Sequence, residues 1–275
     1  VINKKLIFNQ QKKILTALLL LLNLTGCSLS FGRKDSLREK SNNINLEIVN
    51  NYSKAILREP NNFFFYLERG RAKHEYGDFK GAIKDFNYSF KIKPDLKVIF
   101  YRANSKYKYG DFKGAIKDYG KLNFFEEYKD QIFYNTASAQ LLNFDYKNAI
   151  ENYTKSIDYD NNDEYAYLYR GDAKSKLKDY EGSLSDYSKS IEINNKSYIA
   201  FNNRGVINFK LKNYSNALKD FKKSLKINPR NYSTFYNKAI TYFKLKEVKK
   251  ACIDLKKSIK LGKEVFKEEY LKICP

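Results

Sequence analysis

The sequence lacks or has little of several residue types. It contains no Trp and no Met, one His, three Cys, four Pro and 12 Gly among 275 residues. So few Pro and Gly argue against a loop-rich, all-β fold. A zinc site of the usual kind needs three or four His or Cys ligands, so we expect no metal. Any Ser-His-Asp or Cys-His mechanism would depend on His74 alone.

Positive charge and aromatic rings are abundant instead. Lys and Arg number 52 against 31 Asp and Glu, which gives a formal net charge of +21. Hydrophobic residues make up 43% of the chain and aromatic residues 16%, with 24 Tyr and 20 Phe. This content is too apolar and too aromatic for a disordered chain, whatever its charge. The length allows one large or two small hydrophobic cores.

The segment 1–27 has the pattern of an export signal. Four lysines precede an apolar run over residues 14–24: Lys4, Lys5, Lys12 and Lys13. The run is shorter than the roughly 20 residues that span a bilayer, and a basic start before a short apolar run is typical of a signal peptide. Leu24-Thr25-Gly26-Cys27 follows directly and resembles the bacterial lipobox.

The lipobox resemblance implies that residues 1–26 are a removed lipoprotein signal peptide and that Cys27 carries the lipid. The chain would then be lipid-anchored and extracytoplasmic in a bacterial envelope, on the periplasmic face of the outer membrane in a Gram-negative cell. The alternative is an ordinary signal peptide that contains a Cys. Residues 27–42 are polar and charged, and we expect them to form a flexible tether.

The rest of the chain is one unit repeated. The nonapeptide Gly77–Asp85 recurs letter for letter at Gly110–Asp118. Weaker copies follow at even spacing and begin at Asp145, Asp179 and later positions. Self-similarity at a fixed period of 34 residues, as between Asp145 and Asp179, is typical of repeat architectures. The units that follow from it are 63–96, 97–129, 130–163, 164–197, 198–231 and 232–265.

The pattern within each unit resembles the tetratricopeptide repeat (TPR), with small residues at positions 8 and 20 and an aromatic residue at position 24. The resemblance implies an all-α, right-handed α-solenoid of about six TPR helix pairs in the array 63–265. A degenerate N-terminal half repeat at 43–62, whose first helix is not recognisable, would precede it. A C-terminal capping helix at 266–275 would close it.

In this family the first helices line a concave groove that binds peptides or protein segments. Carrying over the groove positions predicts a binding surface; the alternative is that these are exposed polar residues without a ligand. The Lys and Asn arrangement with which some relatives hold a terminal carboxylate is not reproduced in register. The predicted groove residues are Arg71, His74, Asn104, Tyr107, Lys108, Tyr134, Asn135, Ser138, Asp172, Lys176, Asn202, Asn203, Phe209, Lys210, Tyr236, Asn237 and Lys244.

Asp at position 23 and Ser at position 27 recur in five of the six units. Read singly, Asp186 and Ser190 resemble an acid and a nucleophile. Their recurrence at fixed register indicates scaffold residues instead. We expect no catalytic residue, no cofactor and no small-molecule substrate, and hence no enzyme.

Cys252 and Cys274 are the two thiols beyond the lipobox. Disulfides persist outside the cytoplasm, and a bond between these residues would staple the terminal cap to the last repeat. The alternative is two buried thiols that pack as small apolar side chains. Of the two, we expect the disulfide.

These features together predict a membrane-tethered interaction scaffold. Its partner would be a protein or peptide, acidic in view of the chain's charge, and the membrane would be bound through lipidated Cys27. The alternatives are a component of envelope or pilus assembly, by fold analogy alone, or a basic adaptor on an anionic membrane or polysaccharide surface. An export signal argues against nucleic acid.

Overall fold

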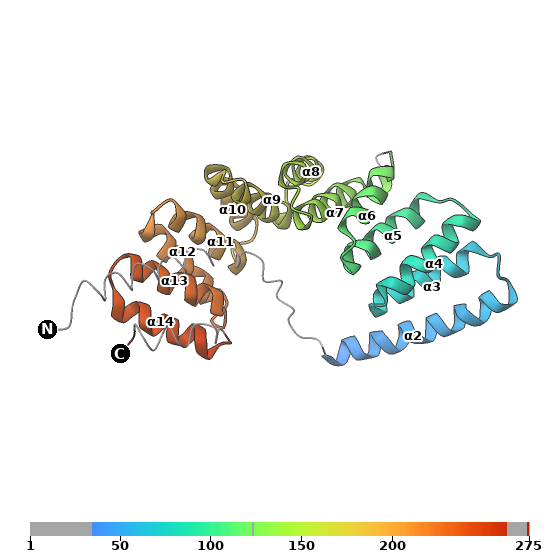
Figure 1. Cartoon of the computed structure of the whole chain (residues 1–275), viewed down its shortest axis with the longest axis horizontal. Helices are drawn as coiled ribbons and strands as arrows, with labels where there is room; N and C mark the ends of the chain where they lie inside the picture. Colours follow the sequence, from blue (N-terminus) through green and yellow to red (C-terminus); the bar gives the residue numbers. More distant parts are fainter. Residues whose placement is uncertain (1–34, 123, 263–273, 275) are drawn as a thin grey trace. The chain divides into compact units, whose positions relative to one another are not determined.

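The structure, a computed structural model, describes residues 35–122, 124–262 and 274. These residues form 13 α-helices and two short 3₁₀ helices without a strand (Figure 1). The prediction of an all-α fold of consecutive helix pairs is therefore confirmed. The expected signal peptide, Cys27 and the capping helix except for Cys274 lie outside the described residues.

The described residues divide into two compact units between Asn162 and Asp163. Residues 35–162 form the N-terminal unit. Its α-helices contact their neighbours in chain order. They are α2 (Asp35–Arg58), α3 (Phe63–Tyr76), α4 (Phe79–Ile92), α5 (Leu96–Tyr109), α6 (Phe112–Tyr119), α7 (Lys129–Leu142) and α8 (Tyr146–Tyr159).

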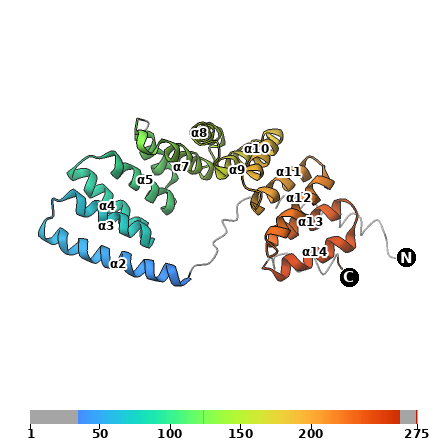
Figure 2. The same cartoon turned by 180° about the vertical axis from the view of Figure 1, so that it is seen from behind.

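The C-terminal unit comprises residues 163–262 and Cys274. Three helix pairs follow one another in it, and the first helices of successive pairs, α9 with α11 and α11 with α13, are in contact. Figure 2 shows the same pairs from behind. The helices are α9 (Glu164–Lys176), α10 (Tyr180–Ile193), α11 (Tyr198–Lys210), α12 (Tyr214–Ile227), α13 (Tyr232–Lys244) and α14 (Val248–Lys260).

The core of each pair is built from the positions that the repeat pattern marks. Residues at position 20 (five Ala and Ser183) are fully buried. The large residues at position 24 are at most 3% exposed. A Cβ on Gly205, at position 8, would lie 2.6 Å from the Phe221 ring. Position 8 is therefore small because the aromatic ring of the second helix lies against the backbone of the first.

A buried ion pair joins the two helices of most pairs. A cation at position 7 of the repeat, on the first helix, binds the Asp at position 23 of the repeat, on the second helix; in the repeat 97–129 both residues stand one position earlier. The pairs are Arg69–Asp85 at 2.7 Å, Arg102–Asp118 at 2.8 Å, Arg170–Asp186 at 2.7 Å, Arg204–Asp220 at 2.8 Å and Lys238–Asp254 at 3.0 Å. The recurrent Asp is thus part of the scaffold.

Ser at position 27 also has a structural role. Its hydroxyl donates to the carbonyl of position 1 of its own repeat, as in Ser89 to Phe63 at 3.0 Å and Ser224 to Tyr198 at 2.8 Å. Ser190 is also fully buried, but its hydroxyl makes no such bond. A serine enclosed there has no access to a substrate, which agrees with the scaffold interpretation.

Each turn within a pair contains one residue in the left-handed backbone conformation. In the first two repeats it is a glycine, Gly77 with φ 97° and Gly110 with φ 93°. In the next four repeats it is Phe144, Lys178, Lys212 and Lys246, with φ between 62° and 65°. Glycine adopts this conformation freely, whereas for a residue with a Cβ it costs roughly 1 kcal/mol. The same turn is therefore strained in the later repeats.

Two features differ from the sequence expectation. Helix α2 begins at Asp35, inside the segment expected as tether, and continues without a break to Arg58. Helix α6 stops at Tyr119, because Gly120 begins a 3₁₀ turn (Gly120–Leu122). A second 3₁₀ turn, Glu126–Tyr128, precedes α7. The repeat 97–129 is one residue shorter than the others, and its irregular part lies after α6, where glycine weakens the helix.

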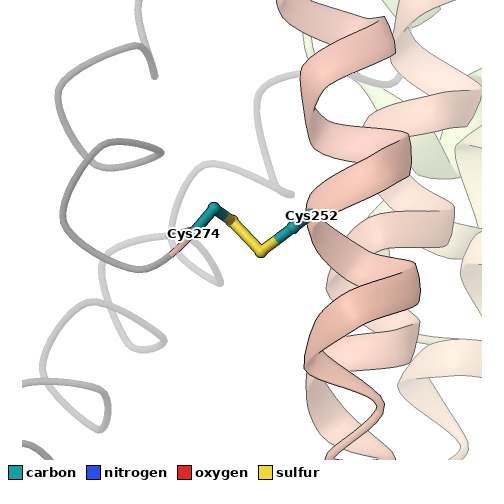
Figure 3. Close-up of a disulfide and its surroundings, with 2 residues drawn as sticks. All are labelled: Cys252 and Cys274. Carbon is teal, nitrogen blue, oxygen red and sulfur yellow. A yellow bond between two sulfur atoms is a disulfide. The ribbon is translucent and has the colours of Figure 1, made fainter.

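Cys252 of α14 and Cys274 form a disulfide, with their Cα atoms 5.6 Å apart (Figure 3). Cys274 is buried in a cluster with Leu255 of α14 and Tyr236 of α13. The bond therefore attaches the end of the chain to the core of the last repeat. Of the two interpretations of these thiols, the structure has the bonded one.

Candidate functional site

A cavity of about 290 Å³ lies among α2, α3, α4 and α5 of the N-terminal unit. It is lined by three predicted groove residues, Arg71 and His74 of α3 and Asn104 of α5. Helix α2 closes one side with Asn45 and Ile48. Consecutive first helices thus bring the predicted residues together, and α2 adds a wall that the repeat pattern did not predict.

His74 is held by hydrogen bonding and packing. Its Nδ1 lies 2.7 Å from the Ser105 hydroxyl oxygen, and its ring meets Phe79 edge-on at 5.3 Å. The Ser105 hydroxyl donates to the Tyr101 carbonyl at 2.9 Å, so His74 donates its Nδ1 hydrogen to Ser105. Burial, helped by the charge of Lys108 and opposed by Glu75, lowers the pKa of His74. A neutral, fixed imidazole suits recognition of a partner by hydrogen bonding.

Arg71 is the most accessible cation of this cavity. Its side chain is 47% exposed, pairs with Glu68 at 2.9 Å and lies over the Tyr101 ring at 5.0 Å. The exposed Lys108 lies on the next first helix. Arginine stacked on an aromatic ring keeps several donors available for a carboxylate. Arg71 and Lys108 are therefore the residues best placed to meet an acidic group.

The amides of this unit support the same face. Asn135 of α7 donates to the side-chain amide oxygen of Asn104 at 3.2 Å, and Tyr119 donates its hydroxyl hydrogen to the same Oδ1. Tyr134 packs edge-on against Tyr153 at 5.8 Å, and Ser138 bonds the Tyr153 hydroxyl at 2.9 Å. Tyr107 packs against Phe112 at 5.8 Å. These predicted residues are partly or fully buried; the Asn135–Asn104 bond links two repeats, and the other contacts join the two helices of one pair.

In the C-terminal unit the predicted residues form a buried hydrogen-bond chain across three first helices. Asp172 Oδ1 accepts from Tyr187 at 2.6 Å and from Asn203 at 3.0 Å. Asn202 donates to Asn203 at 3.1 Å and accepts from Asn237 at 3.0 Å. All four predicted members are at most 9% exposed. Burial places them beneath the surface, together with Tyr236 and Phe209.

Asp172 carries an unusual charge state in that chain. Burial raises its pKa to about 7, and the hydrogen bonds from Tyr187 and Asn203 and the charge of Lys176 limit the rise. The carboxyl group is therefore partly protonated near neutral pH. A titrating group inside a network that joins repeats makes the network sensitive to pH.

Three predicted lysines end the first helices of the C-terminal unit: Lys176, Lys210 and Lys244. The Lys210 ammonium lies 5.4 Å from the centre of the Tyr180 ring in the preceding turn. Burial lowers the pKa of Lys210, and the charge of Lys176 lowers it further. The two lysines are therefore close enough to repel one another.

Within the part of the chain that the structure describes, no group of three or more His, Cys, Asp or Glu is placed to hold a metal ion. No helix among those residues is both long enough and apolar enough to cross a membrane. The site is thus a surface of amides, rings and cations.

Two features were missed in the sequence. One is the cation at position 7. A single Arg or Lys there gives no signal, but its constant spacing before the recurrent Asp indicates the ion pair. The tripeptide Lys-Leu-Lys also recurs once in each of the last three repeats, at 176–178, 210–212 and 244–246. Both signals appear once the repeats are aligned by register.

The sequence matches family profiles of the tetratricopeptide repeat at residues 198–231 and 232–262. Among curated protein sequences, none matches the chain significantly. The other helix pairs are therefore compared with solved structures.

Solved structures with the same fold cover most of the chain. One is the C-terminal part of a TPR repeat-containing protein from Cytophaga hutchinsonii, with a TM-score of 0.69, 18% identity, and coverage of 88% of this chain and 98% of that one. Another is YrrB, described as a TPR protein with an unusual peptide-binding site, with a TM-score of 0.57, 16% identity, and coverage of 71% and 97%. A crystal structure of MamA gives a TM-score of 0.55 at 19% identity, with coverage of 60% and 96%. The profile matches identify tetratricopeptide repeats at residues 198–262, and the recurring helix pairs and these structures show the same fold in the other described helix pairs.

Proposed function

We propose that this protein is an interaction scaffold that binds a segment of a partner protein at the cavity of the N-terminal unit. The main support is that Arg71, His74 and Asn104 line one cavity of about 290 Å³. A cavity of this size holds one or two side chains, not a folded domain. The partner therefore inserts side chains there while its backbone runs along the first helices.

The chemistry of the cavity indicates what a partner should offer. Ala72 and Phe86 supply an apolar floor, and Arg71 stands exposed beside it. Its lining also includes Glu68 and Glu75, so the local charge is mixed. An acidic character of the partner is supported by the net charge of +21 and by exposed Lys108, because such a surface attracts acidic segments.

Capture of partners from the native envelope tests this function. The full-length protein would be crosslinked in place as wild type, as Arg71→Ala with Lys108→Ala, and as Lys80→Ala with Lys113→Ala. The control lysines are exposed on second helices of the same unit, so both variants lose two charges. We expect one partner to be lost with the groove variant and kept with the control. Equal recovery by all three proteins would refute the proposal.

We also propose that Cys27 anchors the protein through a lipid. The support is the lipobox tetrapeptide placed directly after the apolar run, and several acyl chains bind a membrane firmly where one is marginal. Labelling with palmitate in a bacterial host should mark wild type and Ser28→Ala but not Cys27→Ala. Label on all three proteins, or on none, would contradict the anchor.

A further inference from the structure

A second charged surface, apart from the cavity, lies on the C-terminal unit. Each first helix there ends in a lysine, continues with a leucine and turns at a second lysine. We call the three turns the Lys-Leu-Lys edge; its residues are Lys176, Leu177, Lys178, Lys210, Leu211, Lys212, Lys244, Leu245 and Lys246.

Successive turns of this edge are neighbours in space. Lys210 reaches the Tyr180 ring, which directly follows the first turn. Leu211 and Tyr180 pack against the same core cluster, and Tyr214 and Phe243 pack against the next cluster. The contacts of α9 with α11 and of α11 with α13 continue this order. Six lysines therefore form one row along the unit.

Among the turns and loops of this unit, positive charge is concentrated at this edge. At the other ends of the helix pairs, the loops 194–197 and 228–231 carry one cation each, Lys196 and Arg230. Two acidic residues border the row and are engaged elsewhere. Asp179 accepts from the Gly182 N–H at 2.9 Å, and Glu247 pairs with Lys250. Six lysines thus face three acidic groups at this edge: Asp179, Glu247 and the buried Asp172 near Lys176.

The second lysine of each turn occupies the left-handed position of the backbone. Lys178, Lys212 and Lys246 adopt left-handed φ values of 62° to 65°. The equivalent turns of the first two repeats use Gly77 and Gly110, where a Cβ would meet no atom within 4 Å. Glycine would therefore fit these turns with less strain. Phe144 adopts the same conformation in the preceding repeat, so the turn accepts different side chains, and in three successive repeats the side chain is lysine.

From this geometry we infer that the Lys-Leu-Lys edge docks the protein on an anionic membrane surface. Clusters of four to eight lysines are typical of segments that bind anionic headgroups. Leu177 is 43% exposed and Leu245 is 39% exposed, so apolar side chains stand between the lysines. Cations alternating with exposed apolar groups suit a bilayer interface better than an acidic peptide, which would leave the leucines in water. The inference does not depend on the cavity or on Cys27.

Vesicle binding by the full-length protein tests the edge. The probes would be phosphatidylcholine vesicles with and without about 30 mol% phosphatidylglycerol, at low salt and at about 0.5 M NaCl. One variant combines Lys178→Gly, Lys212→Gly and Lys246→Gly, which removes three charges and keeps the turns. Its control combines Lys219→Gln, Lys223→Gln and Lys226→Gln, exposed positions on α12. The segment 1–34 is identical in all three proteins, so its contribution cancels.

Each lysine near such a surface contributes roughly fivefold in affinity. We expect the glycine variant to bind anionic vesicles on the order of 100-fold more weakly at low salt, with the control much closer to wild type. Circular dichroism should show all three equally folded. Equal binding by both variants, or equal binding of neutral and anionic vesicles by wild type, would overturn the inference. Loss of binding to poly-glutamate with unchanged vesicle binding would also overturn it, in favour of an acidic protein.

Discussion

At the scale of single residues, the position in the repeat decides whether a polar side chain stabilises the fold or is exposed to a partner. Asp186 and Arg170 lie between two helices and bond each other. Arg71 lies on the same kind of helix but remains 47% exposed. The difference comes from the face of the helix that each position occupies. Substitutions on the inner face should therefore change stability, and substitutions on the exposed face should change binding.

Removing Asp186 should be costly. Asp186→Ala would leave Arg170 and Lys174 without their shared carboxylate in a mostly buried place, and we expect a loss of about 3 kcal/mol in the free energy of unfolding. Glu192→Ala on the same helix breaks the exposed pair with Lys189 and should cost under about 1 kcal/mol. Urea unfolding followed by circular dichroism measures both. Equal losses would contradict the scaffold role.

Asp172 should make stability depend on pH. Its pKa is raised by burial to about 7, so folding favours the protonated carboxyl. This contribution is fully present below the ordinary pKa of Asp and is lost as pH rises through 7. Asp172→Asn should therefore match wild type near pH 4 and exceed it by a few kcal/mol near pH 8.

Urea midpoints of wild type and Asp172→Asn between pH 4 and 8 measure this difference. The lowered pKa of His74 acts in the opposite direction. Because the folded state favours the neutral imidazole, the protein loses stability as pH falls. This effect is common to both proteins and cancels. Parallel curves for the two proteins would show that Asp172 does not titrate in this range.

At the scale of helices and turns, the repeat pattern predicted much of the fold. The buried residues at positions 20 and 24 and the helix pairs were visible in the sequence because they recur. The start of α2 at Asp35 and the end of α6 at Tyr119 occur once each and have no copy to reveal them. The burial of Asn202 and Asn203 depends on bonds between repeats, which one repeat cannot predict.

The left-handed turns predict opposite changes in the free energy of unfolding for two substitutions. Lys212→Gly should raise the free energy of unfolding by about 0.5 kcal/mol or more, because φ 63° suits glycine. Gly110→Lys should lower it by about 1 kcal/mol, since the added Cβ meets no neighbour and only the backbone is strained. Thermal and urea unfolding would check both changes. The same sign for both would show that the left-handed turn is not the determinant.

The disulfide should stabilise the last repeat. Closing a loop between Cys252 and Cys274, at a sequence separation of 22, contributes roughly 3 kcal/mol. Reduction, or replacement of both by Ser, should lower the thermal midpoint and release α14 first in hydrogen exchange. Non-reducing mass mapping should recover the two cysteines in one linked pair of peptides. Two free thiols in protein isolated from the envelope would remove this staple.

At the scale of the whole molecule, each of the two compact units has its own core. The C-terminal unit contains clusters around Tyr187 and around Phe221. Repeats draw their stability from their neighbours, so a unit with three complete pairs should fold alone. We expect residues 163–275 to give a helical spectrum and a cooperative thermal transition. A spectrum of an unfolded chain would show that this unit requires residues 35–162.

The two identical nonapeptides at 77–85 and 110–118 occupy equivalent turns and caps. A genetic crossover between them would delete or duplicate one whole repeat and leave an intact turn at the junction. The chain can therefore change its number of repeats in one step, without passing through a broken fold. Recombination of this kind would change the length of the array and, with it, the extent of the binding surface.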